Sequence, residues 1–276
     1  MIHAVLYQTA DADRYFPMLS ATLPANRAFC LRHGVRLEAF IGLRRGFHPW
    51  HAAFNRLGFL RDRLAEGFRG WAIYLDADAF VADLGFDLAA YLAARAQHGM
   101  VHPPGAGQGP WDVNSGVFLW NFAHAATRET AQRWIASFDA IPDSALRAAP
   151  EWDDVDNDQL LLQRIFQTDA GLLAAVHQED PSLIGYQQSR FIKQFVRNTV
   201  HTPEQRLLRI AREVALCLRR SGIKPGVDSA TVLHAWQLLR GRPPETLEAA
   251  FEALDQPDLK ALRVLITRPK PPVESG

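Results

Sequence analysis

Strand-like and helix-like segments alternate through the first 80 residues, and this alternation constrains the fold more than any other feature of the sequence. Short apolar, strand-like runs cover residues 3–7, 36–42 and 71–75. Apolar residues at helical spacing fill the segments between them, at residues 15–33, with a break expected at Pro24, and at 50–67. Strands joined by helices of this length predict an α/β fold with a mainly parallel sheet and right-handed crossovers.

The middle of the chain continues the alternation around one long loop rich in glycine and proline. Helices are expected at 85–99, 125–138 and 156–168, and strands at 115–120 and 172–176. The loop at 102–113 carries Trp111 and is too long for a simple connector. Two interpretations of this loop are open: it closes over a ligand or shapes the ligand's site, or the tryptophan only holds the loop down.

The chain changes character near residue 190. Nine basic residues between positions 190 and 224 are set against two acidic ones. The helix expected at 204–220 has one apolar face, so it either packs on the core with a solvated basic side or forms a surface for anionic lipid or a phosphorylated ligand. Further helices are expected at 228–239 and 244–254. We therefore predict one domain over residues 1–200 and a helical C-terminal extension over 201–276.

Composition argues against several classes of protein. The 276 residues include 30 basic and 30 acidic side chains, so the net charge gives no overall reason to expect nucleic-acid binding. The only cysteines, Cys30 and Cys217, give no disulfide framework and favour a reducing compartment. The first apolar run is too short for a signal peptide, and no stretch reaches the length of a membrane span. We expect a cytoplasmic protein, with the basic segment 190–224 allowing peripheral contact with the inner face of the membrane.

Two aspartates end the third strand-like run, in WAIYLDADAF at 71–80. In parallel sheets, ligands bind beyond the carboxyl ends of the strands, which is where Asp76 and Asp78 lie. In an extended chain these side chains share a face and repel each other unless a cation lies between them. Hard oxygen ligands suit Mn²⁺ or Mg²⁺, which could grip a diphosphate. The alternative is that one aspartate caps the following turn and the other is merely exposed.

The order of four segments then becomes informative. FNRLGFLRDRL, WAIYLDADAF, VNSGVFLWN and DNDQLLLQRI follow one another in a way that resembles the nucleotide-sugar glycosyltransferases of the GT-A fold, particularly galactosyl- and mannosyltransferase types with a DxD motif. The likeness covers about residues 1–200 and rests on order and spacing. It implies a GT-A, Rossmann-like domain that moves a hexose from a UDP- or GDP-sugar to a hydroxyl of a glycan, lipid-linked or small-molecule acceptor. It also implies Mn²⁺ or Mg²⁺ held by Asp76 and Asp78, with Asp78 the direct ligand and Asp76 reaching the metal or the ribose.

The resemblance implies roles for further residues. Donor-binding positions are Tyr7, Gln8, Thr9, Arg56, Asp76, Ala77, Asn114, Ser115 and Gly116. Polar residues near the anomeric carbon are Asp158 and Gln159. A third metal ligand in such enzymes is a histidine near the end of the catalytic domain. His177 and His201 are the candidates and we take His201, although no flanking motif selects either and Gln178 or Gln194 could lie as near.

Simpler interpretations stand beside several of these assignments. Residues 114–116 could form only a strand-start turn, and Arg56 could be an ordinary surface arginine. Any of Asp156, Asn157 and Asp158 could serve only as the N-cap of the helix that follows.

Two rival functions remain open at this level. A phosphohydrolase of the haloacid-dehalogenase type also uses DxD at a strand end, with the first aspartate as nucleophile. Such enzymes usually carry Thr or Val two residues after the second aspartate, where this chain has Phe80, and they place the motif on the first strand. The second rival is a non-catalytic sugar-nucleotide-binding protein of the same fold.

Overall fold

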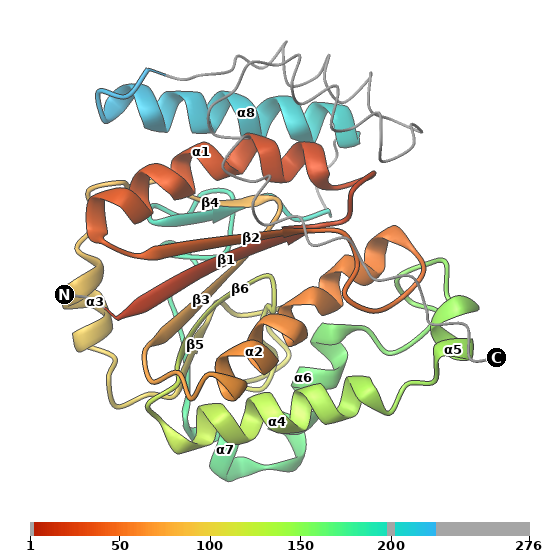
Figure 1. The fold of residues 1–276 in the computed structure, drawn as a ribbon. Helices are drawn as coiled ribbons and strands as arrows, with labels where there is room; N and C mark the ends of the chain where they lie inside the picture. The colour runs from red at the N-terminus through yellow and green to blue at the C-terminus, as the bar shows by residue number, and fades with distance from the viewer. Residues whose placement is uncertain (1–2, 198–201, 225–276) are drawn as a thin grey trace.

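A computed structural model of the chain describes residues 3–197 and 202–224, and Figure 1 shows a sheet between layers of helices. The described residues form a six-stranded sheet in the order β2-β1-β3-β6-β5-β7. Its strands are β1 (Ala4–Ala10), β2 (Arg36–Ile41), β3 (Trp71–Asp76), β5 (Met100–His102), β6 (Val117–Asn121) and β7 (Val176–Gln178). β6 runs antiparallel to both neighbours, and the other adjacent pairs are parallel. The predicted α/β fold with a mixed, mainly parallel sheet flanked by helices is confirmed.

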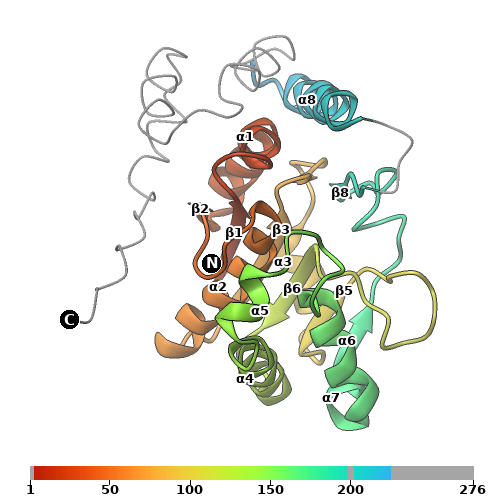
Figure 2. The ribbon, with the colours of Figure 1, turned by 90° about the vertical axis from the view of Figure 1, so that its right-hand side faces the viewer.

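Helices cover both faces of the sheet. α1 (Phe16–His33) and α8 (Pro203–Arg220) lie together on one face, as Figures 1 and 2 show. α2 (Asn55–Ala65), α4 (Ala125–Asp139) and α6 (Asp158–Thr168) cover the other face. Shorter helices are α3 (Leu88–Ala93), α5 (Asp143–Arg147), α7 (Ala170–Ala174) and a 3-10 helix at Pro49–Phe54.

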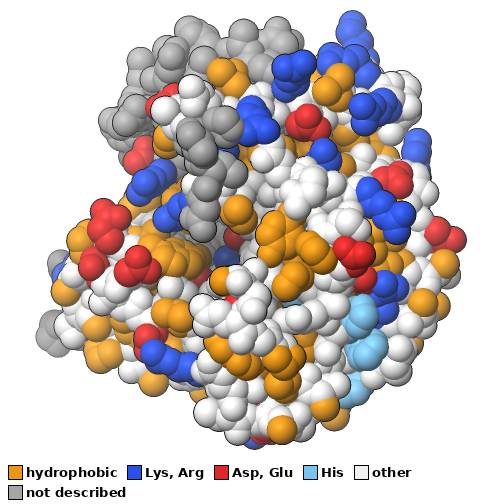
Figure 3. Space-filling model, turned by 180° about the vertical axis from the view of Figure 1, so that it is seen from behind, with side chains coloured by type: hydrophobic (Ala, Val, Ile, Leu, Met, Phe, Trp, Pro, Cys, Tyr) orange, Lys and Arg blue, Asp and Glu red, His pale blue; other side chains and the backbone are white. Residues whose placement is uncertain are grey.

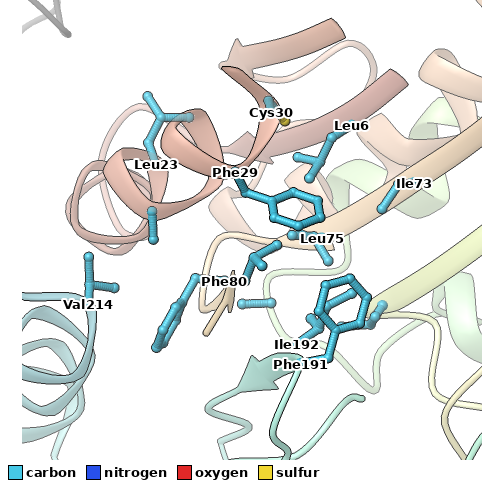
Figure 4. Close-up of a cluster of buried hydrophobic side chains, with 14 of the residues drawn as sticks. Leu6, Leu23, Phe29, Cys30, Ile73, Leu75, Phe80, Phe191, Ile192 and Val214 are labelled. Carbon is cyan, nitrogen blue, oxygen red and sulfur yellow. The ribbon is translucent and has the colours of Figure 1, made fainter. Parts of the chain in front are cut away.

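Two hydrophobic cores fill the spaces between these layers. In the first, Phe29 of α1 lies beside Leu6 and Leu75 of the sheet, and Leu23 of α1 and Val214 of α8 belong to the same cluster (Figure 4). The second core, on the other face, is rich in aromatic side chains. Tyr7 there stacks on Phe59 with ring centroids 4.4 Å apart. Burial of apolar area on both faces is the main favourable term for such a sheet.

Backbone pairing brings distant residues together at one edge of the sheet. Thr9 of β1 lies opposite Asp76 of β3 in a parallel register. β6 begins at this same edge because it is antiparallel, and the amide of Asp76 donates to the carbonyl oxygen of Gly116, 2.8 Å away. The carboxyl ends of β1 and β3 and the residues before β6 therefore meet at one place.

A small second sheet continues from this edge. β4 (Ala79–Val81) follows the second aspartate directly and pairs antiparallel with β8 (Ile192–Gln194). Ala79 lies opposite Gln194 in this register. The pairing carries residues near 194 to Asp78 and brings the start of α8 to the same edge.

Several predicted boundaries differ from the structure. α1 runs through Pro24 without a break, because Leu23 and Ala25 are buried on either side and their packing outweighs the lost hydrogen bond. The segment 50–67 divides into a 3-10 turn and α2. Residues 172–176, predicted as a strand, belong mostly to α7, which starts where the Asp169 side chain accepts from the amide of Leu172 at 3.0 Å.

The C-terminal extension is described only as far as residue 224. α8 confirms the predicted helix at 204–220, and its apolar face packs into the same core as α1. The helices expected at 228–239 and 244–254 lie outside the described residues. The boundary at residue 200 stays a prediction.

Candidate active site

A cleft of about 550 Å³ opens at the edge where β1, β3 and β6 meet. Its lining includes many of the residues singled out from the sequence: Thr9, Arg56, Asp76, Ala77, Asp78, Asn114, Ser115, Gly116 and Gln159. The rest of the lining includes residues that the sequence did not single out as site residues: Tyr15, Trp50, Tyr74, Glu151, Trp152, Asp153, Arg197 and Arg206. Gln194, which the sequence offered only as an alternative, also lines it.

Asp76 ends β3 with its carboxylate held on one side. Oδ1 accepts hydrogen bonds from Arg56 Nη2 and from the Tyr74 hydroxyl, each at 2.8 Å. Burial raises the pKa of Tyr74 well above its ordinary value, so this hydroxyl stays protonated and donates. The other oxygen, Oδ2, lies 3.3 Å from Nε2 of Gln194.

Asp78 lies in the turn between β3 and β4, and its two carboxylate oxygens are paired in the same way as those of Asp76. Its Oδ2 pairs with the guanidinium of Arg206, at the start of α8. Its Oδ1 lies 3.3 Å from the same Nε2 of Gln194 that faces Asp76. Each aspartate therefore gives one oxygen to an arginine and turns the other toward a common point.

A chain of hydrogen bonds fixes the orientation of the Gln194 amide. The backbone amide of Gly116 donates to Asn114 Oδ1 at 2.7 Å. Asn114 Nδ2 must then be the group that donates to Gln194 Oε1, at 2.8 Å. The NH₂ group of Gln194 is therefore the end that faces both carboxylates, an arrangement that hydrogen-bond matching alone determines.

Glycine at position 116 is required by this crowding. A Cβ atom built there would lie 2.2 Å from Gln194 Nε2 and 2.5 Å from Asp76 Oδ2. The absence of a side chain at this position lets the backbone approach both Gln194 and Asp76 closely.

Arg56 joins two carboxylates beneath the cleft. Its side chain is 2% exposed, and Nη1 lies 2.9 Å from Asp158 Oδ2 while Nη2 contacts Asp76. The guanidinium also lies over the Tyr74 ring, 4.5 Å from the centroid. Burial opposes its charge, but Asp158 and Asp76 outweigh burial and raise the pKa of Arg56. The interpretation of Arg56 as an ordinary surface arginine is wrong.

Asp158 itself lies behind the cleft and does not line it. Its Oδ2 accepts from the Ser115 hydroxyl at 2.9 Å, and the side chain is fully buried. Burial raises the pKa of Asp158, and the charge of Arg56 opposes this shift. The helix N-cap is Asn157, whose side chain accepts from the amide of Leu160. The structure thus gives Asp158 a supporting position in place of the predicted one beside the anomeric carbon.

Of the two residues predicted near the anomeric carbon, Asp158 and Gln159, Gln159 is the one that lines the cleft. Its Oε1 accepts from the backbone amide of Ser115 at 3.1 Å. Among the described residues, none accepts a hydrogen bond from its amide nitrogen. That NH₂ group is left for a ligand.

Tyr7 and Gln8 do not line the cleft. β1 extends to Ala10, beyond the predicted strand end, so both residues lie inside the sheet and are 2% and 0% exposed. Gln8 Nε2 instead donates to the carbonyl oxygen of Ala79 at 3.1 Å. Thr9 reaches the cleft, and its hydroxyl accepts from Asn55 Nδ2 at 2.8 Å.

The two histidine candidates for the metal lie elsewhere. His201 falls outside the described residues. His177, on β7, stacks with His98 at 4.9 Å and lies 3.6 Å from Glu179. Histidine side chains gather on the face shown in Figure 3, but His177 is not part of the cleft lining. Gln178 is also away from the cleft, and it donates to the carbonyl oxygens of Pro110 and Asp112 at 3.0 Å, which holds the long loop in place.

The donor set suits a small hard cation. Two carboxylate oxygens from different aspartates converge on one point, and Mn²⁺ or Mg²⁺ prefers such ligands. Within residues 3–197 and 202–224, no group of three His, Cys, Asp or Glu side chains is placed to hold a metal ion. A cation at this point would replace the Gln194 amide nitrogen that lies there and would take two described protein ligands. Mg²⁺ usually keeps several waters or phosphate oxygens besides.

Comparison with known proteins identifies the fold. No protein-family model matches the chain. No curated protein matches it either. A solved glycosyltransferase involved in the glycosylation of the major capsid of PBCV-1 is 12% identical and superimposes with a TM-score of 0.55, over 76% of this chain and 98% of that one. The chain has the fold of a GT-A glycosyltransferase.

Two further solved structures are less similar in shape. Apo GlyE, a glycosyltransferase of Streptococcus pneumoniae TIGR4, is 14% identical with a TM-score of 0.47, over 86% of this chain and 63% of that chain. Galactosyltransferase LgtC, solved with donor and acceptor sugar analogs, is 12% identical with a TM-score of 0.42, over 77% of this chain and 95% of that chain. The GT-A fold of this chain rests on the first likeness. In the described part of the chain, no helix is both long and apolar enough to cross a bilayer.

Proposed function

We propose that this chain is a glycosyltransferase that uses Mn²⁺ or Mg²⁺ to transfer a hexose from a UDP- or GDP-sugar to a hydroxyl group. The acceptor would be a glycan, a lipid-linked sugar or a small molecule. The observation that carries this proposal is the convergence of Asp76 Oδ2 and Asp78 Oδ1 on one point, each 3.3 Å from the same nitrogen, at the carboxyl edge of a GT-A sheet.

The charge of the cleft supports a need for a cation. Three arginines line the cleft against four acidic side chains, Asp76, Asp78, Glu151 and Asp153. A diphosphate adds at least two negative charges to a site that already carries an excess of one. A divalent cation between the aspartates would offset this repulsion and stabilise the diphosphate as it leaves.

The chain's own residues would orient the reactants around that point. Arg56 and Tyr74 keep Asp76 Oδ1 occupied, so Asp76 presents only Oδ2. Gly116, which has no Cβ, lets the Gln194 amide lie beside that oxygen. The amide nitrogen of Gln159 can hydrogen-bond a sugar hydroxyl, and Ser115 fixes the other end of that amide.

The phosphohydrolase alternative finds less support. Phe80 occupies the position where such enzymes usually carry Thr or Val, and it is fully buried. Two strands, β1 and β2, also precede the motif. A chromogenic phosphate ester tests this rival, because metal-dependent hydrolysis that Asp76→Asn abolishes would favour it.

Thermal stability with ligands tests the proposal directly. A ligand that binds only the folded state raises the free energy of unfolding by RT ln(1 + [L]/Kd). We expect one UDP- or GDP-sugar to raise the melting temperature with Mn²⁺ and not with EDTA. Asp78→Asn should lose this shift, measured from its own baseline, whereas Asp83→Asn, an exposed aspartate outside the cleft, should keep it.

Turnover separates an enzyme from a binding protein of the same fold. Release of UDP or GDP that depends on an acceptor would support transfer. Binding without release, across glycan, lipid-linked and small-molecule acceptors, would favour the non-catalytic alternative. The cytoplasmic location and the contact of segment 190–224 with a membrane stay predictions, which fractionation and vesicle binding would test.

A further inference from the structure

Arg206 reaches the site from the far end of the described chain. It lies in the first turn of α8, where the Thr202 side chain caps the helix. The side chain is 9% exposed, and it pairs with Asp78 while its Nε donates to the carbonyl oxygen of Phe195. A charged group of the basic C-terminal segment is therefore built into the floor of the cleft.

The site holds few positive charges to balance its carboxylates. Arg56 is shared between Asp76 and Asp158, on the side away from the common point. Arg206 is the cation that pairs with Asp78 among the described residues. The Gln194 amide between the aspartates is neutral and only donates. Without Arg206, Asp78 would be a buried carboxylate beside a second one.

A divalent cation at the common point would meet this guanidinium as a near neighbour of like charge. Both would rest on opposite oxygens of one carboxylate. Like charges at such separations repel strongly in a partly buried site, where the effective dielectric constant is well below that of water. The two cations therefore compete for the charge of Asp78.

We propose that Arg206 is a resident counter-ion of Asp78 that competes with a divalent cation for the charge of this carboxylate, so that cation binding and docking of the first turn of α8 oppose each other. This inference rests on the proposed metal-dependent function and adds a positioning residue to it. Linkage makes the effect reciprocal: whatever removes the Arg206 charge tightens cation binding, and bound cation loosens the contact of Arg206 with Asp78.

Mn²⁺ binding, followed by electron paramagnetic resonance of the free ion, tests the inference without any assay of turnover. We expect Arg206→Met to lower the Kd for Mn²⁺ by about tenfold or more and to lower the melting temperature in EDTA. Arg206→Gln, which can still donate to the carbonyl oxygen of Phe195, is a second neutral variant in case the first does not fold. Arg206→Lys, which keeps the charge, should stay within about threefold of the wild type.

Arg212→Met is the matched control. Arg212 is an exposed arginine on the same helix and is not part of the cleft, so this variant removes the same charge without touching Asp78. Its Kd for Mn²⁺ should equal that of the wild type. If it tightened binding as much as Arg206→Met, general electrostatics of α8 would explain the effect and the inference would be overturned.

The other outcomes are distinct. Equal or weaker Mn²⁺ binding by the neutral variants at position 206 overturns the inference and leaves the proposed function standing. No Mn²⁺ binding by the wild type or by any variant overturns the metal-dependent function, and this inference with it.

Discussion

The guanidinium of Arg56 and the carboxylate of Asp158 form an ion pair out of reach of solvent: Nη1 lies 2.9 Å from Oδ2, and the two side chains are 2% and 0% exposed. The pair joins α2 to the start of α6. It also fixes Arg56 for its second contact with Asp76, 2.8 Å away. A buried charge that supports a site in this way is costly to leave alone.

Arg56→Met should therefore lower the free energy of unfolding by about 3–5 kcal/mol, because Asp158 is left as an unpaired buried carboxylate. Denaturation in urea measures this loss. Arg61→Met provides the control on the same helix: Arg61 pairs with Asp139, and both side chains are about half exposed, so the cost should be under about 1 kcal/mol. Equal losses in the two variants would contradict the assignment of a buried pair.

Gly116→Ala should abolish cation and donor binding while the protein stays folded. The added Cβ would lie 2.5 Å from Asp76 Oδ2 and would displace Gln194, but the backbone at this position needs no left-handed conformation. Calorimetry with Mn²⁺ and a nucleotide sugar measures binding, and circular dichroism checks the fold. Gly85→Ala is the control, since its Cβ meets only the Asp83 side chain at 3.5 Å. Normal binding by Gly116→Ala would refute the crowding argument.

Sequence alone could locate the aspartates but not their partners. Asp76 ends a run of apolar residues, which is a local signal, and the strand pattern placed it at the carboxyl edge of the sheet. Gln194 and Arg206 lie 118 residues from Asp76 and 128 residues from Asp78. No local spacing connects such positions, because β4–β8 pairing and the packing of α8 bring them together. For the same reason, the sequence did not show that Arg206, on the basic helix α8, contacts an aspartate of the site.

Errors about single residues had local causes. Tyr7 and Gln8 were placed at a strand end, but β1 is buried on both faces, so no alternation of polar residues marked where it stopped. Asp158 and Asn157 are both plausible caps in sequence. Asn157 is the N-cap because Arg56 and Ser115 hold the Asp158 carboxylate away from the helix end.

Stability should fall as the pH drops from about 6.5 to 4, in part because of His102. This histidine is fully buried, and its Nε2 accepts from Trp120 Nε1 at 2.7 Å, so it is neutral. Burial lowers the pKa of His102 to about 4. Since the unfolded chain takes up a proton near pH 6.5 and the folded chain does not, this group removes up to about 3 kcal/mol across that range.

His102→Gln should reduce this pH dependence. Urea denaturation at pH 7 and pH 4.5 gives the two free energies for each protein, and the difference should be smaller in the variant. The pKa of His51 is also lowered to about 4 by burial, so part of the dependence should remain. Identical differences in the wild type and the variant would show that His102 is not held neutral. The variant should also disturb the site, because His102 Nδ1 lies 3.2 Å from the carbonyl oxygen of Asn114.

α8 should stabilise the domain in its own right, although its sequence position suggests an appendage. Ile210 of α8 is fully buried in the core that α1 shares. Ile210→Ala removes three carbons from that core and should cost about 2–5 kcal/mol of unfolding free energy, as large-to-small core substitutions do. Arg212→Ala, two residues away and exposed, should change it by less than about 0.5 kcal/mol. If both changes were small, α8 would be loosely attached, and Arg206 could not be held firmly enough against Asp78 to compete with a cation.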